Sequence, residues 1–271
     1  MTEIDLLFQE LRQAGRKALM PFVTAGDPDL DFTADVIRVL AQRGCHLCEV
    51  GIPYSDPIAD GPVIQASYTR ALEHRVKLHQ ILDMLRGVSG QISMPRVTMV
   101  SYAIIYRHGL ERYVAEAKEA GVAGAIVPDL LVEEAGPLSE ICRRESFNLI
   151  QLVTPTTSRE RQLRIANSST GFLYYVSVTG ITGERTQLPP QLADNVAWLR
   201  EQTDLPICIG FGINQPEHVR MLAPAADGLI VGSAIVRRVA NAATAPRADV
   251  LQDVGDYVES LLRALQTPAI S

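Results

Sequence analysis

The sequence is poor in aromatic residues and in long apolar runs, and these shortages exclude whole classes of protein. Only 6% of the residues are aromatic, and a single tryptophan is present. No stretch of about 18 apolar residues occurs, so we expect no transmembrane helix. Residues 1–5 carry acids where a secretory signal would carry lysines. Together these absences predict a cytoplasmic protein.

Cysteine is also scarce, because the chain has only Cys45, Cys48, Cys142 and Cys208. Four cysteines in 271 residues do not suggest a disulfide framework, so we expect reduced thiols. The Cys45-x-x-Cys48 spacing occurs in zinc and redox sites. Zinc would require two more ligands at matching spacing, and a redox pair would begin a helix, whereas this pair leads into a strand. We interpret both residues as core residues and predict no metal site.

Basic clusters are missing as well. The net charge is −6 without a basic block, which argues against a nucleic-acid-binding protein. The hydrophobic content of 47% is typical of a globular protein. The length suits one large domain or two small ones, but no linker rich in Ser, Gly or Pro divides the chain. We therefore predict a single domain over residues 1–271.

A strand followed by a helix recurs along the chain. A preliminary helix over residues 4–11 precedes the first strand, Ala18–Thr24, and its helix, 30–43. The later pairs are 47–53 with 63–85, 96–103 with 110–120, 123–127 with 133–144, 148–153 with 158–166, 171–177 with 190–201, 206–210 with 216–223, and 228–231 with 235–240. A last helix spans 251–265. The pattern contains eight strand–helix units.

The predicted strands are short continuous apolar runs, as parallel strands covered on both faces require. Eight such units in this length favour a closed barrel, since an open doubly wound sheet more often has five or six strands. We predict a single (β/α)8 TIM barrel with an extra N-terminal helix. In such a barrel the active site lies in the loops at the carboxyl ends of the strands.

Two carboxylates stand at that position in the second unit. Glu49 is an acid within an apolar strand, where an unpaired charge is expensive to bury. Asp60 follows a turn-rich segment that can fold back over the strand end. An acid/base pair is one interpretation. In the other, Glu49 pairs with a Lys or Arg and Asp60 caps the helix that begins near Pro62.

Glycine-rich segments follow the last three predicted strands, at residues 180–183, 210–213 and 232–235. Glycine lets backbone N–H groups approach an anion, and the helix that opens at Ser233 adds a positive dipole end. Glycine at a single turn would be weak evidence, but three such loops favour phosphate binding. The predicted phosphate-binding residues are Gly183, Gly212, Gly232 and Ser233.

Five motifs resemble one family over nearly the whole chain. They are PFVTAGDP (21–28), EVGIPYSDPIADGPVIQ (49–65), TGITG (179–183), GFGI (210–213) and DGLIVGSAIV (227–236). In this order they closely resemble the α subunit of tryptophan synthase. The resemblance implies a lyase that cleaves indole-3-glycerol phosphate to indole and glyceraldehyde 3-phosphate, without a metal or organic cofactor. It also implies a β subunit that receives the indole, in an α2β2 assembly.

The resemblance implies roles for individual residues. Glu49 would shuttle protons during the carbon–carbon cleavage, and Asp60 would hold the indole N–H. Tyr175 would position the substrate or Glu49, although aromatic residues on barrel strands are usually core residues. Tyr174 is expected to point the other way. The remaining predicted substrate contacts are Phe22, Val100, Ile126 and Phe211 as walls for the indole, and Thr182 as a partner of Asp60 when the loops close.

Three segments depart from the family pattern, while Glu49 and Asp60 are present. Ile104 stands where asparagine is common, the segment Asp129-Leu130-Leu131 lacks the usual proline, and Val178-Thr179 replaces a pair that often contains arginine. In the family the first two lie near the β-subunit surface. A free-standing lyase that releases indole without a β subunit is therefore an alternative. A third reading is an inactive barrel that only activates a β subunit, and the two intact carboxylates argue against it.

Overall fold

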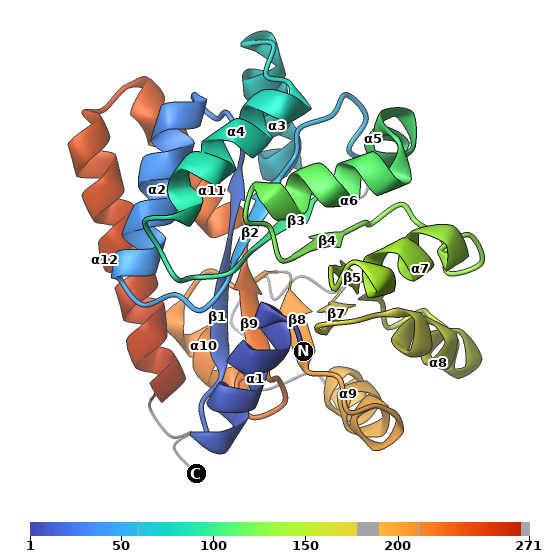
Figure 1. Ribbon diagram of the computed structural model, residues 1–271. Helices are drawn as coiled ribbons and strands as arrows, with labels where there is room; N and C mark the ends of the chain where they lie inside the picture. The colour runs from blue at the N-terminus through green and yellow to red at the C-terminus, as the bar shows by residue number, and fades with distance from the viewer. Residues whose placement is uncertain (59, 178–189, 211, 267–271) are drawn as a thin grey trace.

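The computed structural model describes residues 1–58, 60–177, 190–210 and 212–266. Figure 1 shows its helices arranged around a central set of strands. The strands are β1 (Ala18–Thr24), β2 (Cys48–Gly51), β3 (Arg96–Met99), β4 (Gly124–Ile126), β5 (Asn148–Ile150), β6 (Leu152–Val153), β7 (Leu173–Val176), β8 (Ile207–Gly210) and β9 (Gly228–Val231). The helices are α1 (Glu3–Gln13), α2 (Leu30–Gln42), α3 (Pro62–Glu73), α4 (Leu78–Ser89), α5 (Tyr102–His108), α6 (Leu110–Glu119), α7 (Gly136–Arg144), α8 (Arg159–Ser168), α9 (Pro190–Gln202), α10 (Pro216–Leu222), α11 (Ser233–Val239) and α12 (Arg247–Gln266), with a 3₁₀ turn at Ala240–Ala243.

All strand pairs are parallel, and the sheet order is β5-β4-β3-β2-β1-β9-β8-β7-β6. The two ends of this order, β5 and β6, are separated in the chain only by Gln151. β5 pairs with β4, and β6 pairs with β7, so they are two parts of one strand that closes the sheet. The predicted eight-stranded barrel with an N-terminal helix is confirmed.

Alternate residues of each strand enter two different apolar layers. One layer fills the barrel, and it includes Met20, Phe22, Val97 and Met99. The other lies between strands and helices, where Leu19 and Val23 pack with residues of α2, α4 and α12. This two-sided burial follows from the parallel sheet, since helices cover the outer face and side chains fill the interior.

Helix α1 closes the amino-terminal end of the barrel. Its apolar face, Ile4, Phe8 and Leu11, belongs to the interior layer, and the Phe8 ring lies 6.0 Å from that of Phe172. Thr2 caps the helix by accepting a hydrogen bond from the backbone N–H of Asp5. With the amino-terminal end covered in this way, the other end of the barrel is left for a substrate.

Local differences from the predicted elements have local causes. The predicted helix over 63–85 is divided into α3 and α4, because the chain turns at Arg75 with a φ of 55°. Lys77 then starts α4, and its N–H donates to Gln80 Oε1. The end of the predicted strand 96–103 is instead the start of α5, which Ser101 caps. None of the helices in the described ranges is long and apolar enough to cross a membrane.

Candidate active site

A cavity of about 280 Å³ opens at the carboxyl ends of the strands. Inward-facing residues of β1, β2, β3, β7 and β9 form its floor, and the loops after β2, β8 and β9 form its walls. The lining residues are Phe22, Glu49, Asp60, Gly61, Pro62, Val63, Ile64, Met99, Tyr174, Gly212, Ile213, Asn214, Ile230, Gly232, Ser233, Ala234 and Arg237. Both predicted acids and three of the four predicted phosphate-binding residues therefore share one cavity.

Glu49 lies on β2 opposite Phe22 of β1 and has no solvent exposure. Neither of its carboxyl oxygens has a hydrogen-bond partner among the described residues. Burial without a compensating cation raises the pKa of this carboxyl well above its usual range. The interpretation in which Glu49 pairs with Lys or Arg is thus wrong within the described part of the chain. The raised pKa favours the protonated form of this carboxyl, which can donate a proton.

Asp60 is half-buried at the end of the loop that leads into α3. The loop is held by Gln65, whose Nε2 donates to the carbonyls of Asp60 (2.8 Å) and Pro57 (3.2 Å). Gly61 is the N-cap of α3, without a side-chain cap, so the interpretation of Asp60 as a helix cap is wrong. Burial raises the pKa of Asp60 to about 6. Burial thus raises the pKa of both carboxyls in the cavity, which brings them toward the range that suits acid/base chemistry.

Tyr174, rather than Tyr175, faces the cavity. Tyr175 packs in the outer layer, where Asn195 Nδ2 of α9 donates to its hydroxyl over 3.3 Å. Burial, Glu49 and Asp60 raise the pKa of the Tyr174 phenol well above its usual range, so it remains a hydrogen-bond donor. The expected orientations of the two tyrosines were therefore reversed. Periodicity could not decide between them, because both faces of this strand are buried.

The same inversion affects the third strand. Val100 belongs to the outer layer, and its neighbour Met99 lines the cavity. Phe22 lines the cavity as predicted, whereas Ile126 lies in the interior layer but not among the residues around the cavity. The strand register explains why Met99 faces inward. Met99 pairs with Gly51 of β2, and Gly51 lies two residues after Glu49, so it faces the same side of the sheet.

The predicted phosphate-binding residues form one side of the cavity. Gly212 has a φ of 79°, a left-handed conformation that favours glycine. Gly232 is the N-cap of α11, and Ser233 is the first residue of that helix. The remaining expectations for this region, Gly183, Thr182 and Phe211, lie outside the described residues.

Tyr68 and Arg237 were not identified from the sequence. The Tyr68 side chain is buried, its hydroxyl has no partner among the described residues, and its ring lies 5.6 Å from that of Tyr54. Burial, together with Asp60, raises the pKa of Tyr68 well above its usual range. Arg237 lines the cavity near Ser233. The sequence offered one indication of Arg237. It lies four residues after Ser233, and this spacing places the two residues on one helix face.

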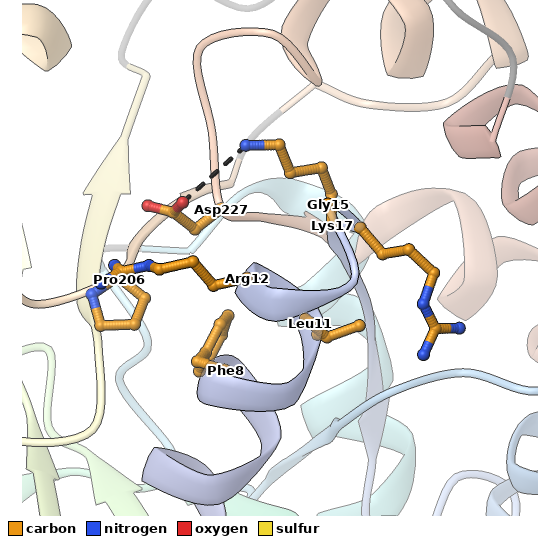
Figure 2. Close-up of a pocket in the computed structure, with 8 residues that line it drawn as sticks. Phe8, Leu11, Arg12, Gly15, Lys17, Pro206 and Asp227 are labelled. Carbon is orange, nitrogen blue, oxygen red and sulfur yellow. Dashed lines mark ion pairs between the residues drawn. The ribbon is translucent and has the colours of Figure 1, made fainter.

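A second hollow, of about 120 Å³, lies at the opposite end of the barrel against α1. Figure 2 shows the Lys17 side chain extended toward Asp227 at this hollow. Asp227 also lies 3.0 Å from Arg200 and accepts from the backbone N–H of Ile207. Burial lowers the pKa of Lys17. The acid here is fully engaged in contacts within the protein, unlike the acid in the cavity at the other end.

All four cysteines are free and buried. Burial raises the pKa of Cys45 to about 12. Within the described residues, no group of His, Cys, Asp and Glu side chains could hold a metal ion.

Fold and cavity together define a (β/α)8-barrel enzyme whose cavity contains two carboxyls beside glycine-bearing loops. A family model described as tryptophan synthase alpha chain matches residues 8–264. The chain belongs to this family. It is a carbon–carbon lyase, which cleaves indole-3-glycerol phosphate in tryptophan biosynthesis.

Individual relatives agree with this family. The tryptophan synthase alpha chain of Rhodopirellula baltica is 61% identical over 275 residues, covering 98% of this chain and 99% of that protein. A crystal structure of tryptophan synthase subunit alpha from Legionella pneumophila superposes with a TM-score of 0.89 at 34% identity, covering 98% of each chain. A structure of tryptophan synthase from M. tuberculosis has a TM-score of 0.87 at 25% identity, covering 98% of this chain and all of that one. The resemblance identified from the motifs is confirmed.

Proposed function

We propose that the cavity at the carboxyl ends of the strands is where indole-3-glycerol phosphate is cleaved, with Glu49 and Asp60 as the catalytic residues. The observation that carries this proposal is the buried, unpartnered carboxyl of Glu49, which shares the cavity with Asp60. A carboxyl kept without a partner costs stability, so its retention points to a chemical role.

The cleavage requires one proton to enter and one to leave. Glu49 in its protonated form, which burial favours, donates its proton to C3 of the indole, and the ring becomes a cation with its charge at the N–H. The resulting carboxylate then accepts the proton of the hydroxyl on the adjacent glycerol carbon. The C3–carbon bond breaks as the carbonyl of glyceraldehyde 3-phosphate forms, and its electron pair returns to the indole. Glu49 ends in its starting state.

Asp60 complements this cycle through its charge. A carboxyl with a pKa of about 6 is mostly ionised at neutral pH, so it can accept a hydrogen bond from the indole N–H and stabilise the cationic ring. Phe22 and Met99 contribute apolar surface for the flat ring, and the Tyr174 hydroxyl is a donor near both acids. Gly212, Gly232 and Ser233 receive the phosphate. Thr182, Phe211 and Gly183 remain predicted contacts.

A β subunit is the proposed partner, in the α2β2 assembly that the family resemblance implies. Large apolar side chains are exposed on loops beyond the strand ends, with Ile58 93% exposed after β2 and Leu131 52% exposed after β4. Such side chains suit a protein contact. One observation favours the free-standing alternative, because Ile104 packs against the outer apolar layer of this chain instead of projecting outward.

The deciding experiment measures indole release from indole-3-glycerol phosphate by the isolated chain, and then with a β subunit titrated in. We expect slow release alone and a rise of about 10-fold or more on titration, which is about 1.4 kcal/mol of coupling. A flat response with fast intrinsic turnover would establish the free-standing lyase. No release under either condition would leave only the inactive, activating barrel.

Two further predictions accompany this proposal. A cytoplasmic location is supported by the four free, buried cysteines. A single domain over residues 1–271 is supported by one closed sheet, whose strands run from residue 18 to residue 231.

A further inference from the structure

Two adjacent arginines of α11 have different surroundings. The Arg238 guanidinium lies 3.6 Å from the centre of the Tyr257 ring, Nε lies 3.4 Å from Asp253, and Nη1 donates to the carbonyl of Ala234. Arg237 lines the cavity and has no hydrogen bond or ion pair among the described residues. The guanidinium of Arg238 is therefore committed to the protein, whereas that of Arg237 is available to a ligand.

The position of Arg237 directs it toward the phosphate-binding residues. It lies four residues after Ser233 on the same helix, and long side chains on a helix lean toward its amino terminus. The amino terminus of α11 is where Gly232 and Ser233 line the cavity. A guanidinium at this position reaches the rim above the glycines.

The charges of the cavity make this cation important. Among the described lining residues, Glu49 and Asp60 are acids and Arg237 is the sole cation. A phosphate monoester carries close to two negative charges at neutral pH, and an ionised Asp60 repels it. Backbone N–H groups supply only partial positive charge, of the order of half a unit charge at a helix end. A full cation with a forked set of donors is matched to the oxygens of a phosphate.

We propose that Arg237 binds the phosphate of the substrate and selects phosphorylated over dephosphorylated indole-glycerol. This inference rests on the proposed function of the cavity. Because Arg237 is exposed at the rim, it acts on capture of the anion and not on the bond-breaking step. Its contribution therefore appears in KM and in the salt dependence of kcat/KM.

The test compares Arg237→Gln with Arg238→Gln in steady-state indole release by the full chain. We expect Arg237→Gln to raise KM for indole-3-glycerol phosphate about tenfold, with kcat changed less than about twofold. It should also flatten the fall of kcat/KM with increasing NaCl. Arg237→Lys should recover part of the loss, since it keeps the charge without the fork. Arg238→Gln should leave KM unchanged and lower the melting temperature.

A second measurement removes turnover from the test. Glycerol 3-phosphate is titrated into each protein to measure its dissociation constant. It should bind the unmodified chain and Arg238→Gln with equal affinity, and Arg237→Gln about tenfold more weakly. Discrimination against dephosphorylated indole-glycerol should shrink by the same factor in Arg237→Gln. An unchanged KM, salt dependence and glycerol 3-phosphate affinity in folded Arg237→Gln would overturn the inference. An unmodified chain that releases no indole, even with a β subunit, would instead overturn the proposed function.

Discussion

The two ends of the barrel place an acid in opposite environments. At the amino-terminal end, Asp227 lies 3.0 Å from Arg200 and 3.8 Å from Lys17, and it accepts from the backbone N–H of Ile207. At the carboxyl-terminal end, Glu49 has no partner within the described residues and no exposure. A partnered acid contributes to the stability of the fold, whereas an unpartnered buried acid favours its protonated form and costs stability.

The carboxyl-terminal end of the barrel also contains a partnered acid. Asp27 is buried, and its two carboxyl oxygens accept from Arg70 of α3 at 2.8 and 2.6 Å. A 2.6 Å hydrogen bond between Thr24 and Ser67 links β1 itself to α3. These contacts anchor α3, whose N-cap Gly61 follows Asp60. Asp27 is thus a structural acid near the proposed catalytic residue Asp60.

The largest predicted effect is on turnover, which should depend on the acid at the carboxyl-terminal end of the barrel and not on the acid at the amino-terminal end. Glu49→Gln keeps the shape of the side chain but removes the exchangeable carboxyl proton. We expect kcat for indole release to fall at least ~10²-fold with little change in substrate binding. Asp227→Ala is the matched control, because it removes a carboxyl at the far end and should retain kcat. Near-normal turnover in Glu49→Gln would remove Glu49 from its proposed role.

The next effect concerns the phosphate side of the cavity. A β-carbon at Gly232 would lie 3.7 Å from the Phe22 side chain, which is ordinary contact, so alanine fits there. Gly232→Val adds bulk toward the anion, and we expect it to raise KM about tenfold with kcat largely retained. Gly232→Ala should stay near the unmodified KM. Steady-state kinetics of the two folded variants give the KM values to compare. Equal KM values for Gly232→Val and Gly232→Ala would argue against phosphate binding by the backbone at this position.

The free energy of unfolding should depend on Asp227 more than on Glu49, which is the reverse of the order expected for turnover. Asp227→Ala leaves Lys17 and Arg200 without their carboxylate and the Ile207 N–H without its acceptor. We expect the free energy of unfolding to fall by about 1 kcal/mol, a modest value because these cations are partly exposed. Urea unfolding measures it. Glu49→Gln should not be destabilised in this way, and a larger loss there than in Asp227→Ala would contradict the comparison.

The smallest predicted effect is a pH dependence of stability. Burial raises the pKa of folded Glu49 above the ordinary glutamate value of 4.5, so the folded chain binds this proton more tightly than the unfolded chain. The contribution of Glu49 to the free energy of unfolding is therefore fully present below pH 4.5, and it is lost as the pH rises toward the pKa of the folded state. Asp60 behaves likewise between its ordinary value of 3.8 and about 6.

The measurement is urea unfolding at several pH values above the ordinary glutamate pKa. We expect the unmodified chain to lose stability relative to Glu49→Gln as the pH increases, because the glutamine has no proton to lose. Parallel profiles for the two proteins would show that the Glu49 carboxyl has no raised pKa in the folded state.

Local sequence patterns determined much of this protein. Continuous apolar strands alternating with amphipathic helices predict the parallel barrel, because both periodicities are short-range properties of the chain. An acid within an apolar strand marked Glu49, and glycines after successive strands marked Gly212 and Gly232. Each of these features is visible within a few residues, and nearly all element positions agree with the structure to within a few residues.

Only the tertiary structure decided which side chains meet. Tyr174 and Tyr175 are both aromatic on a strand buried on both faces, so the choice of inward residue depends on the closed sheet and not on periodicity. For the same reason Met99 lines the cavity, and the predicted contact Val100 faces the outer layer instead. Whether Glu49 or Asp227 finds a cation depends on side chains distant in sequence, such as Arg200. The freedom of Arg237 beside the engaged Arg238 likewise results from how α11 packs against α12, which no local pattern encodes.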